Sequence, residues 1–360
     1  MRHWFMLGIV LLICAATFFK CKEPLELANK GEYQLPESFD DRERGENSFR
    51  VVFYNLENLF DTERDSTISD QDFTPEGNYG WSDYRYRAKQ QNMSKTIAAI
   101  GGWELPEIVG VCEIENRRVL EDLISQGSLK KGKYGILHQN SPDRRGIDVG
   151  LLYRKDKVSV LSEHFLRMNF PMSPDTRTRE VLIAKLLVAT DTFIVFVNHW
   201  PSRYGGQAQS EPLRIYVAEQ IKMRTDSIMT CCPNTGIIIM GDFNDEPTNI
   251  SLSQKLEAKK PTENPQSKSL YNLMEGKMNY PGSHKYQGQW AFLDQIIVSG
   301  NLLNEEAPRI KNGTAYIFPA SWLLVEDNRY PGYFPFRTFS GPQYLGGFSD
   351  HLPVYTDIQF

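Results

Sequence analysis

Short apolar runs alternate with amphipathic segments along the chain from Phe49 onward. The runs are rich in Val, Ile and Leu and nearly continuous, which is typical of strands covered on both faces of a sheet. The segment 84–100 places its apolar residues on one face of a helix, and a second helix is predicted to start near Ser210, with Pro212 in its first turn. This alternation predicts an α/β domain with more than one layer of sheet. The predicted strands are 51–56, 107–114, 149–153, 181–188, 193–198, 236–242 and 293–299.

The N-terminus carries a different pattern. An apolar run extends from Trp4 to Phe19 and is shorter than a comfortable membrane span. It predicts an export signal, with an uncleaved membrane anchor as the alternative. Cys21 follows the run and resembles the acylated cysteine of a bacterial lipoprotein, so we also consider a lipid tether to a membrane. We expect an exported protein, located in the periplasm, at the cell surface or outside the cell. The expected organisation is a signal over 1–21, a linker over 22–47 and one domain over 48–360.

Composition narrows the class of protein. Hydrophobic residues make up 41% of the 360 residues and charged residues 24%, which is ordinary for a soluble globular chain. The formal net charge of -5 argues against a general polyanion binder, although a local basic strip remains compatible with a nuclease. The cysteines form neither a disulfide framework nor a zinc pattern, and Cys112 is predicted to be buried. We expect a monomer.

Two polar motifs stand next to predicted strands. Asp242 and Asn244 come at the end of the apolar run 236–242, and their oxygens suit a hard cation such as Mg²⁺. Asp350 and His351 lead into an apolar stretch at Val354 and Tyr355, and a histidine beside an acid suits general acid or base chemistry. The alternative for both motifs is an ordinary surface turn.

Acids also occur at the ends of the other apolar runs. Glu113 closes a fully apolar strand and is costly to bury without a partner such as a metal ion. Asn55 and Glu57 lie two residues apart, so on a strand they share a face. The alternatives are a rim carboxylate in solvent for Glu113 and a strand-ending turn residue for Asn55.

A histidine, an arginine and an aspartate complete the candidate set. His199 and Arg203 come just past a predicted strand, and the guanidinium of Arg203 suits bidentate binding of a phosphate. Asp294 stands near the start of a strand, where it is placed to accept a hydrogen bond from a histidine Nδ1. The alternatives are a structural histidine and a strand-entry acid that faces water.

These motifs, in this order, resemble those of the endonuclease/exonuclease/phosphatase superfamily, whose members include deoxyribonuclease I, inositol-polyphosphate 5-phosphatases and neutral sphingomyelinases. The resemblance covers about residues 49–360. The segments 54–61 and 145–149 are similar to a bacterial exported branch of that superfamily.

The resemblance implies a four-layer α/β sandwich with two packed mixed sheets flanked by helices. It implies Mg²⁺ or Mn²⁺ as cofactor, held by Glu113, Asp350 and Glu57. It further implies that Asp294 orients His351 and that Asp242 and Asn244 bind the attacking water. The implied catalytic residues are Asn55, His199, Asp242, Asn244, Asp294 and His351, with Arg203 as a phosphate-binding candidate.

The sequence therefore predicts a metal-dependent hydrolase of phosphodiesters that resembles a nuclease, acting on nucleic acid or on a small or lipid phosphodiester. A phosphatase or phospholipase-type enzyme on sugar phosphates or lipid headgroups is one alternative, and a non-catalytic surface binding module is another. The aromatic stretch 311–348 is expected either to stack on a substrate or to pack on its own rings.

Overall fold

The computed structural model describes residues 44, 47–277, 281–306 and 308–360. These residues all belong to one compact unit, Tyr33–Phe360. The predicted export signal and nearly all of the predicted linker lie outside the described residues. Within the described ranges, each helix is too short or too polar to cross a membrane.

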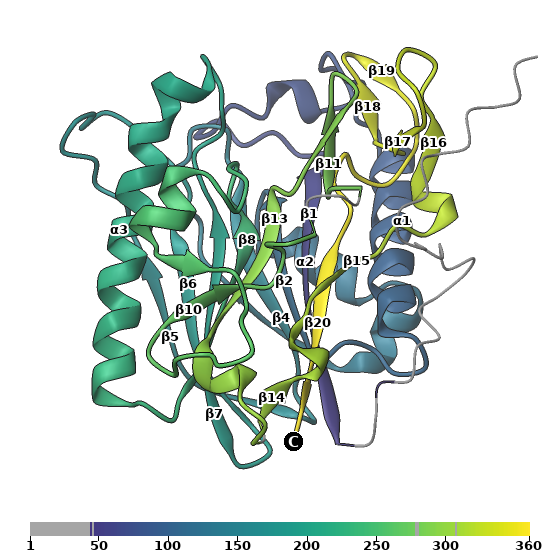
Figure 1. Ribbon diagram of the computed structural model, residues 1–360. Helices are drawn as coiled ribbons and strands as arrows, with labels where there is room; N and C mark the ends of the chain where they lie inside the picture. Colours follow the sequence, from purple (N-terminus) through teal and green to yellow (C-terminus); the bar gives the residue numbers. More distant parts are fainter. Residues whose placement is uncertain (1–43, 45–46, 278–280, 307) are drawn as a thin grey trace, which may run out of the picture. The chain divides into compact units, whose positions relative to one another are not determined.

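Two large mixed sheets form the centre of this unit (Figure 1). Each has seven strands, and each contains a parallel pair, β1 with β2 in the first and β7 with β8 in the second. The first sheet runs β14 (Arg309–Ile310), β20 (Val354–Gln359), β1 (Ser48–Leu59), β2 (Ile108–Ile114), β4 (Asp148–Arg154) and β3 (Tyr134–His138), with β15 (Tyr316–Ile317) also beside β20. The second runs β5 (Val158–Leu166), β6 (Val181–Val188), β7 (Asp191–His199), β8 (Gly236–Asp242), β13 (Asp294–Ser299), β10 (Leu270–Asn272) and β9 (Ala258–Lys259).

Helices and small hairpins complete the unit. The helices are α1 (Asp83–Gly101), α2 (Arg117–Ile124) and α3 (Gln207–Cys231). Three hairpins pair β11 (His284–Tyr286) with β12 (Gln289–Ala291), β16 (Leu324–Glu326) with β17 (Tyr333–Pro335), and β18 (Phe339–Ser340) with β19 (Gln343–Tyr344). Short 3-10 turns lie at Gln71–Phe73, Gly127–Gly132, Gly300–Leu303, Lys311–Gly313 and Ser321–Leu323, and a π-helix at Ser251–Lys255.

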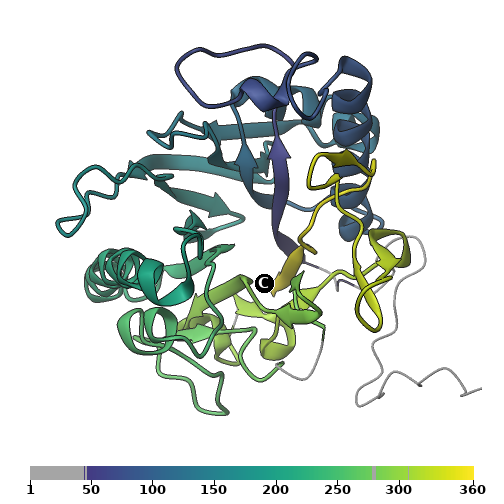
Figure 2. The same ribbon diagram turned by 90° about the horizontal axis from the view of Figure 1, so that it is seen from above.

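The two sheets pack face to face, and the helices cover their outer faces (Figures 1 and 2). Strand β8 is buried on both faces because Ile238 and Met240 join the core between the sheets, whereas Ile237 and Ile239 pack beneath α3. At Gly110 a Cβ would lie 2.6 Å from Met240 Cε, so a larger residue there would require the flexible Met240 side chain between the sheets to shift. The predicted two-sheet α/β sandwich is confirmed.

The structure extends the predicted elements and corrects one of them. The strands 181–188 and 236–242 match their predictions, and Cys112 is buried as expected. Helix α3 begins at Gln207, a turn before the prediction, so Pro212 stands inside it. The missing N–H of Pro212 then removes one intrahelical hydrogen bond near the start of the helix. Strand β5 was not predicted because most of its residues face solvent.

The sheet register brings three predicted residues to one level. His199 on β7 pairs with Asp242 on β8, and Asp242 pairs with Asp294 on β13. The site therefore lies where these strands meet. Glu57, Glu113 and Asn244 stand at neighbouring strand ends with φ of 49°, 59° and 51°. Side chains other than glycine seldom adopt this left-handed conformation, so the backbone is strained where the candidate residues are presented.

Candidate active site

The carboxylate of Asp242 is the centre of a buried polar cluster. Its Oδ2 atom accepts a hydrogen bond of 3.1 Å from Asn55 Nδ2. The same oxygen lies 3.7 Å from His199 Nε2 and 3.9 Å from His351 Nε2. Four residues predicted from separate motifs of the sequence thus meet around one atom.

His351 is oriented from its far side by Asp294. The Nδ1 atom of His351 lies 2.6 Å from Asp294 Oδ2, and Ser283 binds the same aspartate through its hydroxyl group. Burial opposes a charge on His351, but the carboxylates of Asp294 and Asp242 outweigh it and hold the pKa of His351 well above its ordinary value. His351 is therefore an imidazolium at neutral pH, with Nε2 directed toward Asp242.

The imidazole of His199 is neutral, unlike that of His351. Burial, reinforced by the nearby guanidinium groups of Arg179 and Arg145, holds the pKa of His199 well below its ordinary value. Its Nε2 atom lies 3.8 Å from Glu113 Oε1, and its buried Nδ1 has no hydrogen-bond partner among the described residues. The site thus pairs a neutral imidazole with a charged one.

Asp242 and Asn244 are linked by the backbone of their own loop. The amide N–H of Asn244 donates to Asp242 Oδ1 at 2.9 Å, while the Asn244 side chain donates to the carbonyl of Trp200. Burial raises the pKa of Asp242 to about 7. The carboxyl group is therefore poised to exchange a proton near neutral pH.

Glu57 is held by groups from distant parts of the chain. Its Oε2 atom accepts a 2.7 Å hydrogen bond from the Thr338 amide and lies 3.7 Å from Lys89 Nζ. Burial, and then the charge of Asp350, raise the pKa of Glu57 to about 7. Lys89 is itself buried, which lowers its pKa. Sequence analysis did not single out Lys89, because the contact joins positions far apart in the chain.

Asp350 forms an ion pair with Arg337, a residue of the aromatic stretch 311–348. Burial opposes its charged form, but His351 and Arg337 outweigh that effect and lower the pKa of Asp350 to about 2. The Oδ1 atom of Asp350 lies 4.0 Å from His351 Nε2. Asp350 thus connects the Asp242 cluster with the aromatic stretch.

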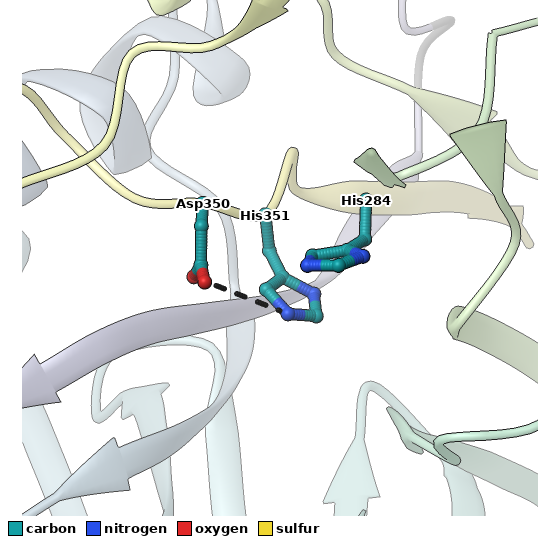
Figure 3. Close-up of side chains that lie close together, drawn as sticks. All are labelled: His284, Asp350 and His351. Carbon is teal, nitrogen blue, oxygen red and sulfur yellow. Dashed lines mark ion pairs between the residues drawn. The ribbon is translucent and has the colours of Figure 1, made fainter. Parts of the chain in front are cut away.

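His284 is a site residue that sequence analysis missed. Its ring lies beside that of His351, with the centroids 4.7 Å apart, and Asp350 stands on the other side of His351 (Figure 3). Burial lowers the pKa of His284 to about 4, so this imidazole is neutral. Its position at the start of a short hairpin strand, outside any long apolar run, gave no indication of a role.

Arg203 is held by the loop that follows β8. Its Nε atom donates to the carbonyl of Asn244 at 2.7 Å, and another guanidinium nitrogen donates to Asn249. These contacts shape the loop that carries Asn244. Binding of a phosphate by Arg203 stays a prediction.

The aromatic stretch 311–348 packs largely on its own rings and on α1. Trp322 lies against Phe348 with ring centroids 5.0 Å apart, and the Lys95 ammonium group of α1 lies over Trp322. Tyr344 receives the Arg85 guanidinium in the same way. These contacts favour the interpretation of the stretch as a packed insertion.

The pKa shifts predict how stability changes with pH. Folded Asp242 and Glu57 keep their protons up to about pH 7, whereas their ordinary pKa values are 3.8 and 4.5. The free energy of unfolding therefore falls as the pH rises between these limits. His351 acts in the same direction above pH 6.5, because only its folded form stays protonated. His199 and His284 oppose this trend, but only up to their ordinary pKa of 6.5.

We expect urea denaturation in chelating buffer to give a lower free energy of unfolding at about pH 8 than at about pH 5.5. The variant Glu57→Gln should flatten this dependence, because it removes one of the groups that releases a proton. A free energy that rises over the same range would contradict the protonation of Asp242 and Glu57 in the folded protein.

Fold and site together define an α/β sandwich of the hydrolase type. The chain belongs to the Endonuclease/Exonuclease/phosphatase family, whose model matches residues 50–359. No curated protein matches the chain in sequence.

Solved structures share the fold at low sequence identity. TDP2 of D. rerio, humanized by 14 mutations, has 14% identity and a TM-score of 0.52 over 87% of this chain and 99% of its own. The human Nocturnin catalytic domain with bound sulfate anion has 16% identity and a TM-score of 0.51, covering 87% and 94% of the two chains. A family protein from Bacteroides thetaiotaomicron has 17% identity and a TM-score of 0.51, covering 86% and 97%.

Members of this family generally depend on a divalent metal, and the site contains donors that fit one. The described part of the chain contains two trios of residues that could hold a metal ion. Within each trio, the candidate ligand atoms lie within 4.8 Å of one another. Neither trio includes Glu113 or Glu57, two of the three predicted metal ligands. Buried Asp242 retains a raised pKa, so its negative charge lacks full compensation, as expected for a cation site. The trios are Asp242, Asp294 and His351, and His284, Asp350 and His351.

Proposed function

We propose that this protein is an exported hydrolase that cleaves phosphodiesters with an activated water molecule. One observation carries the proposal. The Asp242 carboxylate faces the neutral imidazole of His199 and the charged imidazole of His351, and Asp294 holds the charged one. Such an arrangement combines a base with hydrogen-bond donors in one buried place, which is what attack of water on a phosphate requires.

Asp242 is the base in this mechanism. Its raised pKa matches neutral pH, where a carboxylate both exists in the charged form and accepts a proton efficiently. Asn55 fixes the orientation of the carboxylate through the hydrogen bond to Oδ2, and the amide of Asn244 holds the other oxygen. Water bound to Asp242 is thereby directed at the phosphorus atom, and its proton passes to the carboxylate.

His351 is the principal donor to the phosphate. As negative charge builds on the phosphate oxygens, the imidazolium Nε2–H stabilises it, and Asp294 prevents the ring from turning. His199 contributes a neutral imidazole whose Nε2 lies 3.7 Å from the same Asp242 oxygen. These interactions strengthen in the transition state, so their loss should lower kcat more than it raises KM.

A divalent cation, Mg²⁺ or Mn²⁺, would be held by the oxygen atoms of Glu113 and Asp350 and would neutralise phosphate oxygens. Glu113 suits this role because Oε2 is anchored by the Asn58 amide at 3.0 Å, which leaves Oε1 near His199 for a ligand. Glu57 is the least suited of the three predicted ligands, because Thr338 and Lys89 already bind it.

A phosphatase or phospholipase-type activity is the second candidate. The net charge of -5 favours a small or lipid substrate over a long nucleic acid, because binding to a polyanion relies on basic surface. A non-catalytic binding module is the third candidate. The Asp294–His351 pair beside the Asp242 carboxylate speaks against it, because binding alone needs no base.

A substrate panel tests these alternatives. Purified protein with Mg²⁺ is assayed on a bis-aryl phosphodiester, the matching monoester, plasmid DNA, phosphoinositides and sphingomyelin. We expect the diester to be hydrolysed at least about tenfold faster than the monoester, and chelation to remove the activity reversibly. A preference for the monoester would favour the phosphatase. Failure to turn over any substrate would support the binding module.

A further inference from the structure

Arg337 lies between strands β17 and β18 and forms an ion pair with Asp350 of the site. The geometry points to Arg337 as a residue that binds the phosphate of the substrate, delivered to the site by the aromatic stretch 311–348. The inference rests on the proposed function and adds to it a positive charge that the motifs of the sequence did not reveal.

The guanidinium of Arg337 is only partly used within the protein. One terminal nitrogen donates to Asp350 Oδ2. The Nε atom is buried and has no hydrogen-bond partner within the described ranges, since Glu57 Oε1 lies 3.9 Å away. A buried donor without an acceptor is unfavourable. A hydrogen bond from this N–H to an oxygen of a ligand would therefore be favourable.

The same side chain remains open to solvent on one side. Its relative exposure is 32%, whereas Glu57 and Lys89 beside it are almost completely enclosed. A ligand that enters the site can therefore reach Arg337 without displacing the core. The planar guanidinium suits this task because it can keep one carboxylate and bind a second oxyanion at the same time.

Arg337 is also held in place before any ligand arrives. The next residue, Thr338, donates its amide to Glu57 and its hydroxyl to the carbonyl of Phe348. Lys89 of α1 donates to the same hydroxyl and to the same carbonyl. These contacts fix the backbone that presents Arg337, so binding would need little ordering of the chain.

Asp350 places Arg337 next to the catalytic imidazolium. One oxygen of Asp350 binds Arg337, and the other lies 4.0 Å from His351 Nε2. Two positive groups thus stand on either side of one carboxylate. A phosphate that accepts from His351 is within reach of Arg337 as well, which makes both cations available to its oxygens.

The alternative is an ion pair that only stabilises the fold. Binding of inorganic phosphate separates the two roles, because it does not depend on turnover. Isothermal calorimetry in Mg²⁺ buffer compares the wild type with Arg337→Gln and with the matched control Arg329→Gln. Arg329 belongs to the same stretch, and its guanidinium lies over the ring of Tyr330. Thermal unfolding of each variant is measured in parallel.

We expect Arg337→Gln to weaken phosphate binding about tenfold or more, which is the effect of losing one charge-assisted hydrogen bond. Arg329→Gln should bind phosphate as the wild type does. Arg337→Lys should be intermediate, because it keeps the charge and loses the planar fork. If Arg337→Gln no longer unfolds cooperatively, the phosphate affinity of Arg337→Lys relative to the wild type tests the inference instead.

Unchanged phosphate affinity in Arg337→Gln would overturn the inference, as would a wild type that binds no phosphate. Phosphate binding that depends on Arg337 in a protein without hydrolase activity would leave the inference standing and reject the proposed function instead. A protein that hydrolyses the substrate but binds phosphate independently of Arg337 would reject the inference and leave the proposed function standing.

Discussion

Replacing Asp242 by Asn is expected to lower kcat for a phosphodiester by about 10³-fold or more while the protein remains folded. Asn has nearly the shape of Asp and can still accept from the Asn244 amide through its single oxygen, whereas its NH2 group replaces the oxygen that accepts from Asn55. It cannot take a proton from water. Because Asp242 is buried and its pKa is raised to about 7, the neutral amide also removes an unfavourable charge. The lost hydrogen bond from Asn55 and the removal of this charge act in opposite directions, so stability should change little.

Steady-state kinetics and urea denaturation of the same preparations test this expectation. The matched control is Asp357→Asn, which removes another buried carboxylate, one that forms an ion pair with Arg50 on β1. This control should lose stability, because the buried Arg50 guanidinium loses the carboxylate that accepts from its Nε and a terminal nitrogen, and should keep its turnover number. Equal turnover in Asp242→Asn and the wild type would exclude Asp242 as the base.

The second large effect is expected for His351→Gln, with kcat reduced by about 10²- to 10³-fold and KM changed far less. Gln can donate one hydrogen bond, but it carries no charge for the phosphate oxygens and cannot be held by Asp294 as an imidazolium is. The Asp294 carboxylate then stays buried without its cationic partner, so stability should also decrease.

The matched control for His351 is His138→Gln. His138 is another buried histidine, with Nε2 3.0 Å from Asp148 Oδ2. Loss of this pair is expected to affect stability and to spare kcat. A similar loss of kcat in both variants would show that the effect of His351→Gln comes from a disturbed fold. Comparison of kcat with KM at several pH values completes the test.

The sequence predicted the sandwich and much of the site because both depend on local patterns. Continuous apolar runs marked β6 and β8, and Asp242 followed directly from the end of such a run. The partnership of His351 with Asp294 came from the family resemblance, and the 2.6 Å contact agrees with it.

The remaining features depend on contacts between positions far apart in the chain. Lys89 lies on the buried face of α1, and its polar partners come from distant parts of the chain, Glu57 of β1 and the segment that returns at Thr338. His284 and Arg337 lie in short hairpin strands and loops, where periodicity carries little information. The motif around Glu57 suggested a metal ligand. It could not predict that Thr338 donates a hydrogen bond to Glu57 and that Lys89 forms an ion pair with it.

The left-handed backbone at Glu57, Glu113 and Asn244 has an evolutionary consequence. Glycine adopts this conformation without strain, so at each of these positions the residue best for the backbone differs from the residue that the chemistry needs. Selection for durability alone would drive such positions toward glycine and erase the acids and the amide. Their retention therefore depends on continued selection for what the side chains do, and relaxed selection should leave its first traces here.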